Sequence, residues 1–222
     1  MRVMHVDASA RDRGSYSRAL SARFVESLRR QVPALEVDRL DLALSPPRHF
    51  GALETAAVSL PEADHTPAMR EAIADSDAIV ARVLAADALV IGTPIYNFGM
   101  PSPLKAFFDH VSRNGRTFVA DETGMRGLLG DKRVAILVAA GGSYRPGEIF
   151  DGLDALTPHA RAILGFLGVT DVVFIAARPT MFAGADAADA AFQRAIAEVE
   201  ALAGRWAGER APRPRDDAAR RW

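Results

Sequence analysis

Short apolar segments with the character of β-strands alternate with amphipathic segments of helical period along almost the whole chain. Alternation of this kind is typical of a parallel sheet that is covered by helices on both faces. The strand-like segments are residues 2–7, 35–41, 88–93, 133–139 and 171–177. The sequence therefore predicts an α/β fold built on five parallel strands.

Helices are expected between these strands, at residues 16–31, 67–84, 103–113, 154–166 and 187–206. The pair Thr66-Pro67 is a favourable helix start, because it offers a capping side chain followed by proline at the first helical position. Two stretches are too long for simple turns. They are a Pro-rich connection at 44–66 and a glycine-rich segment at 114–130.

Five strands in this order, with a short loop after the first, are typical of a flavodoxin-like three-layer sandwich with strand order 2-1-3-4-5. Such sheets bind FMN where the strand order reverses, between the first and third strands. Ligand contacts are then expected in the loops after the first, third and fourth strands. We expect residues 1–207 to form a single domain and the Pro- and Arg-rich residues 208–222 to form a disordered tail.

Composition narrows the chemistry that such a sheet could perform. The chain of 222 residues has no cysteine, so redox chemistry would depend on a bound cofactor. A net charge of −1 gives no strong field for nucleic acid or an anionic membrane. Without an apolar span or a recognisable signal peptide, a cytoplasmic protein is expected. The five histidines are scattered, so no metal site is expected either.

Hydroxyl groups are concentrated in the loop after the first expected strand. This loop lacks the G-x-G-x-x-G pattern of dinucleotide-binding folds and the Gly-Lys-Ser/Thr ending of nucleotide-phosphate loops. Instead, Ser9, Ser15 and Ser17 surround the start of a helix, where free N–H groups and the helix dipole favour a monophosphate. The alternative interpretation is that Ser15 or Ser17 only caps the helix.

Aromatic residues follow the third expected strand, within a turn that contains proline and glycine. Tyr96 and Phe98 would form an apolar wall for an isoalloxazine ring, while Asn97 and backbone N–H groups would face its nitrogens. Aromatics at a strand end usually belong to the core, but a segment with prolines and a glycine is not buried regular structure. A ligand-binding role is therefore favoured.

Paired glycines, Gly141 and Gly142, follow the fourth expected strand. Glycine lets the backbone come close to a ligand, and its N–H groups would stabilise negative charge on a reduced flavin. Alone, a Gly-Gly pair indicates only a turn. Its weight comes from its place in a loop where the topology requires a ligand contact.

Together the three loops resemble the FMN-dependent NADH-azoreductase family, which also reduces quinones. The resemblance covers about residues 2–205 and includes the segments 94–98, 104–109 and 164–171. It implies a homodimer that binds one FMN per subunit, with each active site walled partly by the other subunit. The FMN contacts that it implies are Ser9, Ser15, Tyr16, Ser17, Ile95, Tyr96, Asn97, Phe98, Ala139, Ala140, Gly141 and Gly142. Ala139 and Ala140 depart from the family, whose members often have Ser-Arg there.

The expected function is transfer of two electrons from NADH or NADPH to quinones and aromatic azo compounds by a ping-pong mechanism. No catalytic side chain is required, because N5 of the flavin carries the hydride. Phe118, Tyr144 and Phe166 are expected to line the substrate space. The alternatives are an electron carrier, a flavin reductase that supplies reduced FMN to a partner, and a flavin-free hydrolase on the same fold. Electron carriers are usually shorter and strongly acidic, unlike this chain.

Overall fold

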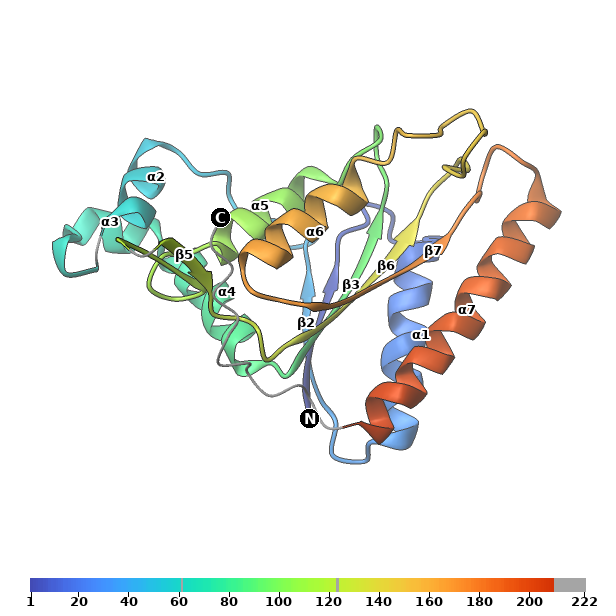
Figure 1. Cartoon of the computed structure of the whole chain (residues 1–222), viewed down its shortest axis with the longest axis horizontal. Helices are drawn as coiled ribbons and strands as arrows, with labels where there is room; N and C mark the ends of the chain where they lie inside the picture. Colours follow the sequence, from blue (N-terminus) through green and yellow to red (C-terminus); the bar gives the residue numbers. More distant parts are fainter. Residues whose placement is uncertain (61, 123, 210–222) are drawn as a thin grey trace.

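A computed structural model describes residues 1–60, 62–122 and 124–209 of the chain (Figure 1). Its central sheet has five strands, all paired in parallel. They are β1 (Arg2–Asp7), β2 (Glu36–Asp41), β3 (Ala88–Pro94), β6 (Arg133–Ala139) and β7 (Asp171–Ala177). Their order in the sheet is β2-β1-β3-β6-β7. The parallel strands, counted in chain order, therefore lie 2-1-3-4-5, as the alternating pattern predicts.

Helices cover both faces of this sheet (Figure 1). On one face, α1 (Tyr16–Gln31) and α7 (Ala185–Gly208) lie side by side. The other face carries α4 (Ala74–Ala85), α5 (Ser102–Val111) and α6 (Leu156–Phe166). Each face has its own apolar cluster. Strands β3 and β6 are buried along their whole length, which explains their almost uninterrupted apolar sequences.

Two of the expected boundaries differ in the structure. The connection at 44–66 contains a helix, α2 (Ala52–Ser59), and a short 3-10 turn (Glu62–Asp64). The single helix expected at 67–84 is divided into α3 (Pro67–Ala72) and α4, because Ile73 between them has a ψ of 6° and leaves the helical conformation. The predicted cap is confirmed: the Thr66 side chain accepts a hydrogen bond from the Met69 N–H at 3.2 Å.

The last helix is longer than expected at both ends. It begins at Ala185 and continues through Gly208, so the first residue of the expected tail belongs to α7. The prediction of a disordered tail concerns residues of which 210–222 lie outside the described part of the chain. Among the helices that the structure describes, none is long and apolar enough to cross a membrane.

The first part of the long connection is fixed to α5 by a buried histidine. The Nε2 atom of His110 lies 2.8 Å from the carbonyl oxygen of Arg48, and its ring centroid is 4.6 Å from that of Phe50. The carbonyl of His110 also accepts a hydrogen bond from Ser76 on α4 at 2.7 Å. His110 on α5 therefore joins the long connection and α4 through two hydrogen bonds and one ring contact.

The segment at 114–130 contains an antiparallel hairpin, β4 (Phe118–Asp121) and β5 (Gly124–Gly127). Its base packs against the end of α6. A Cβ atom added to Gly127 would lie 2.0 Å from the carbonyl carbon of Leu167, and Gly168 has a φ of +90°. The Leu129 N–H donates to the Leu167 carbonyl at 2.9 Å. This segment is thus attached to the three-layer domain by close backbone packing.

Candidate active site

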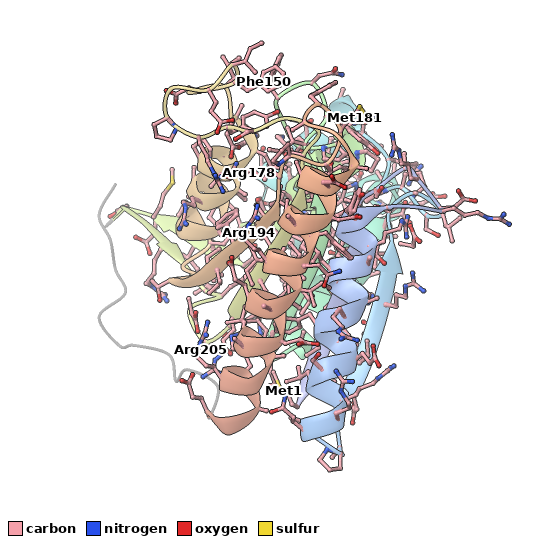
Figure 2. All side chains as sticks on the ribbon, turned by 90° about the vertical axis from the view of Figure 1, so that its right-hand side faces the viewer. Met1, Phe150, Arg178, Met181, Arg194 and Arg205 are labelled. Carbon is pink, nitrogen blue, oxygen red and sulfur yellow. The ribbon has the colours of Figure 1, made fainter. Side chains whose placement is uncertain are left out.

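A cavity of about 510 Å³ lies at the carboxyl end of the sheet, a typical size for a small-molecule site. It is lined by the loops after β1, β3 and β6, as expected, and also by the loop after β7. Figure 2 shows Phe150 and Met181 from this lining at one end of the molecule, opposite Met1. The predicted residues that line it are Ser9, Ser15, Tyr16, Ser17, Ile95, Tyr96, Asn97, Phe98, Ala139, Gly141, Gly142 and Tyr144.

Three predicted site residues do not line this cavity. Ala140 is buried and structural, because its N–H donates to Ala177 and its carbonyl accepts from Thr180. The rings of Phe118 and Phe166 contact each other, with centroids 4.7 Å apart, and pack against the apolar cluster on the α6 face. They lie there because the hairpin is attached beside α6, outside the lining of this cavity, and a contact of theirs with substrate stays a prediction.

The serine side of the cavity is formed by the loop after β1 and the start of α1. Ser15 is the N-cap of α1, and its hydroxyl accepts from the Arg18 N–H at 3.4 Å, so Ser15 caps the helix and also lines the cavity. Ser9 and Ser17 are buried, and the Ser9 hydroxyl accepts from the Arg11 N–H at 3.2 Å. The first N–H groups of any helix have no partner within it and carry partial positive charge. This arrangement is suited to a phosphate monoester.

The turn after β3 presents its aromatic side chains through an unusual backbone conformation. The N–H groups and carbonyls of Tyr96 and Gly99 pair at 3.0 and 2.9 Å, which closes a tight turn. Asn97 and Phe98 between them have φ values of 47° and 70°. A left-handed conformation costs a non-glycine residue about 1–2 kcal/mol, and such strain is typical of functional sites.

Four aromatic rings form the apolar rim of the cavity, with Phe150 at their centre. The centroid of its ring lies 5.9 Å from that of Phe98, 5.6 Å from that of Tyr144 and 5.9 Å from that of Phe182. Phe150 and Phe182 were not predicted from the sequence. Phe182 follows β7, whose carboxyl end reaches the same edge as the other strands, so the topology alone pointed to this loop. Phe150 lies in an irregular loop without a periodic pattern.

The paired glycines connect this rim to the loop after β7. The Gly141 carbonyl accepts hydrogen bonds from the N–H groups of Met181 and Phe182, both at 3.0 Å. Gly142 lies in close contact with the ring of Phe150. The glycines therefore shape the wall of the cavity, a role that adds to the ligand contact predicted from their position.

Tyr144 contributes a neutral hydroxyl at the rim. Burial raises the pKa of Tyr144, nearby Asp154 raises it further, and Arg178 opposes both effects. The phenol therefore stays protonated at neutral pH and is able to donate a hydrogen bond. Within the described residues, no group of three or more histidine and carboxylate side chains is arranged to hold a metal ion.

Comparison with known proteins agrees with the fold. Residues 1–203 match the family model described as flavodoxin-like fold, so the chain belongs to the flavodoxin-like family. It is 45% identical over 202 residues to an FMN-dependent NADH:quinone oxidoreductase of Thiobacillus denitrificans (90% of this chain, 93% of that one). Its identity to an FMN-dependent NADH:quinone oxidoreductase of Azospirillum brasilense is 40% over 204 residues (91% and 98%). Within the flavodoxin-like family, the chain belongs to these FMN-dependent oxidoreductases.

Solved structures show the same architecture. An azoreductase from Bacillus anthracis superposes with a TM-score of 0.83 at 25% identity, covering 92% of this chain and 99% of that one. The azoreductase AzrA also gives 0.83, at 26% identity, with 92% and 100% covered. An FMN-dependent NADH-azoreductase from Bacillus anthracis in complex with FMN gives 0.82 at 24% identity, with 93% and 99% covered, and so shares the fold.

Proposed function

We propose that this protein is an FMN-dependent oxidoreductase that transfers two electrons from NADH or NADPH to quinones and aromatic azo compounds. The observation that supports this most strongly is a single cavity that joins the serine-rich start of α1 to an aromatic rim. The two ends differ in chemistry in the same way as the two ends of FMN, a phosphate and a flat ring. The names of the relatives agree with this proposal.

The residues of the cavity fit FMN at both ends. At one end, the hydroxyls of Ser9 and Ser17 and the first N–H groups of α1 would hold the phosphate. At the other, the turn from Ile95 to Phe98 and the backbone of Gly141 and Gly142 would hold the ring. The glycines matter because a side chain at Gly141 or Gly142 would compete for space with the rim.

The protein would contribute binding, orientation and exclusion of water. Bound FMN supplies the redox chemistry, because its ring accepts a hydride at N5 and passes two electrons on. The rim around Phe150 would provide apolar walls beside the ring of bound FMN, the flat surface on which a nicotinamide or a quinone would stack. One such surface admits one of them at a time, so donor and acceptor would bind alternately in a ping-pong mechanism. Protons for the reduced acceptor would come from water.

The proposal includes a homodimer with one FMN per subunit and active sites shared between subunits. Large apolar side chains at or near the rim are exposed in the single chain, among them Ile149 (84% exposed) and Phe182 (70%). Exposed apolar groups of this kind are typical of a protein interface. We further propose that residues 1–207 act as one domain and that the enzyme works in the cytoplasm. Light scattering coupled to gel filtration tests the dimer.

The absorbance spectrum of the purified protein tests the proposed function. A yellow protein with the visible band of oxidised flavin is expected, bleached by NADH without oxygen and restored by a quinone. A colourless protein that fails to take up added FMN would contradict the proposal. Parallel initial-rate plots are expected for a ping-pong mechanism, and intersecting plots would exclude the shared surface. An electron carrier would instead oxidise NADH slowly by itself.

A further inference from the structure

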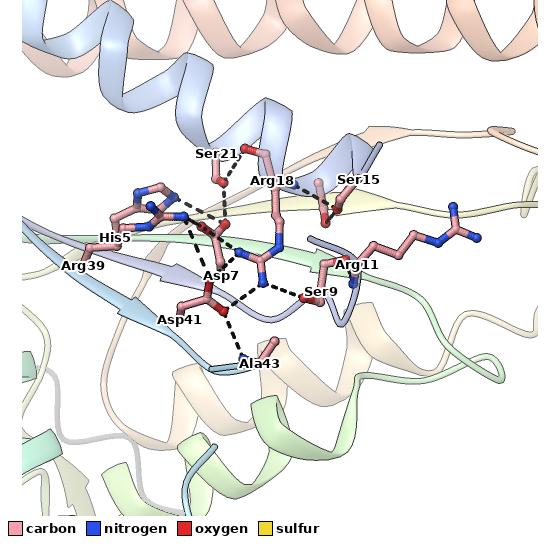
Figure 3. A network of polar contacts seen from close by, with 11 residues as sticks. His5, Asp7, Ser9, Arg11, Ser15, Arg18, Ser21, Arg39, Asp41 and Ala43 are labelled. Atoms are coloured by element: carbon pink, nitrogen blue, oxygen red, sulfur yellow. Dashed lines mark hydrogen bonds and ion pairs between the residues drawn. The ribbon is translucent and has the colours of Figure 1, made fainter. Parts of the chain in front are cut away.

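Arg18 makes a set of contacts that the proposed function does not use. It lies in the first turn of α1, and its side chain is 14% exposed. Its guanidinium donates to both carboxylate oxygens of Asp41, at 2.6 and 2.8 Å, in a two-pronged pair (Figure 3). One of the same nitrogens donates to the backbone carbonyl of Ser9 at 2.6 Å. A single side chain thus connects the start of α1, the loop after β1 and the end of β2.

The contact with Ser9 fixes the loop that forms the serine side of the cavity. Ser9 lines the cavity, whereas Arg18 does not. The guanidinium therefore holds the negative end of the Ser9 peptide at a side chain that does not line the cavity. A carbonyl oxygen turned towards the cavity would repel an anion, so this orientation favours phosphate binding.

The charge of Arg18 is matched by its neighbours. Asp41 is paired with it, and Asp7 lies 3.6 Å away. Asp7 also contacts Arg39 at 3.1 Å and lies 3.4 Å from His5. Within this cluster, carboxylates and guanidinium groups offset one another, so little attraction is left to act on an anion at a distance. Any effect of Arg18 on the cavity then comes from where it holds Ser9.

We propose that Arg18, held by Asp41, is a positioning residue that fixes the loop around Ser9 for the phosphate of the cofactor. This inference rests on the proposed function, because it assumes that FMN binds with its phosphate at the start of α1. Phosphate binding would then require residues that do not line the cavity. The edge strand β2, which lines no part of the cavity, contributes to phosphate binding through Asp41.

The dissociation constants of FMN and riboflavin, measured by quenching of flavin fluorescence, test this proposal. Riboflavin has the ring without the phosphate, so it separates effects on the two ends of the cavity. Arg18→Gln and Asp41→Asn are both expected to weaken FMN binding about tenfold, the loss of one charge-assisted hydrogen bond. Riboflavin binding is expected to change less than about twofold. Arg18→Lys, which lacks the planar fork, should also weaken FMN binding.

Asp41→Asn separates position from charge. It removes a negative charge, so a purely electrostatic role for Arg18 predicts tighter FMN binding in this variant, whereas positioning predicts weaker binding. Arg39→Gln is the matched control: it removes an equal charge from the same cluster, at a side chain that is 61% exposed, bonds Asp7 and lies 4.0 Å from Asp41, with no hydrogen bond to Ser9. FMN affinity in Arg39→Gln should stay like that of the parent.

The outcomes distinguish this inference from the proposed function. If the parent protein binds no FMN, both fall. If the parent binds FMN and riboflavin equally, the phosphate site at the start of α1 and the positioning role fall together, while the proposed reaction stands. If Arg18→Gln and Asp41→Asn bind FMN like the parent, only the positioning role falls. Tighter binding in Asp41→Asn, or equal losses in Arg39→Gln and Arg18→Gln, would also overturn it. Circular dichroism and thermal unfolding confirm that each variant is folded, and Asp41→Asn serves as the test if Arg18→Gln is not.

Discussion

The ring of Phe150 lies against the backbone of Gly142: a Cβ atom added to the glycine would be 2.1 Å from two of the ring carbons. The φ angle of Gly142 is not in the left-handed region, so the backbone conformation at this position does not require glycine. Glycine is thus required here by the neighbouring ring, and the ring at the centre of the rim is placed by the glycine.

Gly142→Ala is expected to destabilise the protein by about 1–3 kcal/mol and to raise the KM for quinone, because the Phe150 ring must move. In a Phe150→Ala background the same substitution should cost much less, since the obstacle is gone. A double-mutant cycle in urea unfolding measures this coupling. Additive losses would show that the two residues act independently.

Phe98 is expected to lower the stability of the protein through its left-handed backbone while its ring contributes to quinone reduction. Phe98→Gly and Phe98→Ala remove the same ring, but only glycine adopts a φ of 70° without strain. Phe98→Gly should therefore be more stable than Phe98→Ala by about 1 kcal/mol in chemical unfolding. Both variants should reduce quinone more weakly than the parent. Equal stability of the two would contradict a strained turn.

Gly92 in β3 leaves no room for a side chain. A Cβ atom there would be 2.7 Å from the Ser21 hydroxyl and 2.8 Å from the Ser17 carbonyl, both on α1. Gly92→Ala should cost about 1–3 kcal/mol and weaken FMN binding as α1 shifts. Gly204→Ala in α7 is the control, because the nearest atom to an added Cβ there, the side-chain oxygen of Gln31 on α1, is 3.7 Å away. It should raise stability by about 0.5–1 kcal/mol through better helix propensity. Equal losses of stability in Gly92→Ala and Gly204→Ala would show that crowding at Gly92 is not the cause.

His110 is expected to protect the chain near Arg48 from proteolysis. His110→Ala removes both the contact with the Arg48 carbonyl and the packing on Phe50. Trypsin cleavage after Arg48 should then be faster than in the parent under native conditions. His110→Phe keeps ring packing and should be intermediate. Mass spectrometry of the first fragments measures the site, and unchanged cleavage after Arg48 would show that the connection is held elsewhere.

Asp41 is expected to make stability depend on pH in the acid range. The hydrogen bonds from Arg18 hold the pKa of the Asp41 carboxyl below its ordinary value of 3.8. A lowered pKa contributes stability above the unfolded value, and that contribution is lost as the pH falls through the folded value. Asp41→Asn should cost about 1.5–3 kcal/mol near pH 7, and progressively less below the unfolded pKa. Urea unfolding across this range measures it, and a constant difference would exclude the pair as its source.

The regular elements of the sheet were predictable from sequence because burial on both faces produces distinct apolar runs. Residues 88–93 and 133–139 are such runs, and β3 and β6 occupy almost the same positions. The edge strand β2 was also found, despite its charges. Helix boundaries were less certain, since the break at Ile73 depends on local backbone geometry that no residue type signals.

The site was predictable where the topology fixes it and not where irregular loops fold back. Ser9, Asn97 and Gly141 directly follow strands, so the sheet order brings them together. Phe150 reaches the cavity from a segment whose path depends on tertiary contacts, such as the hydrogen bond from Ala155 to the Phe98 carbonyl. The role of Arg18 was not predicted, because the sequence does not indicate which groups a charged side chain in the first turn of a helix will contact.

The backbone contact between Gly127 and Gly168 has a consequence for how such proteins diversify. Each residue excludes a side chain on the other, so the junction of the hairpin tolerates almost no change. Beyond that junction the hairpin makes an independent ladder of its own. In evolution or by engineering, the β4–β5 hairpin could therefore be lengthened or replaced while the junction at Gly127 and Gly168 and the central sheet stay the same.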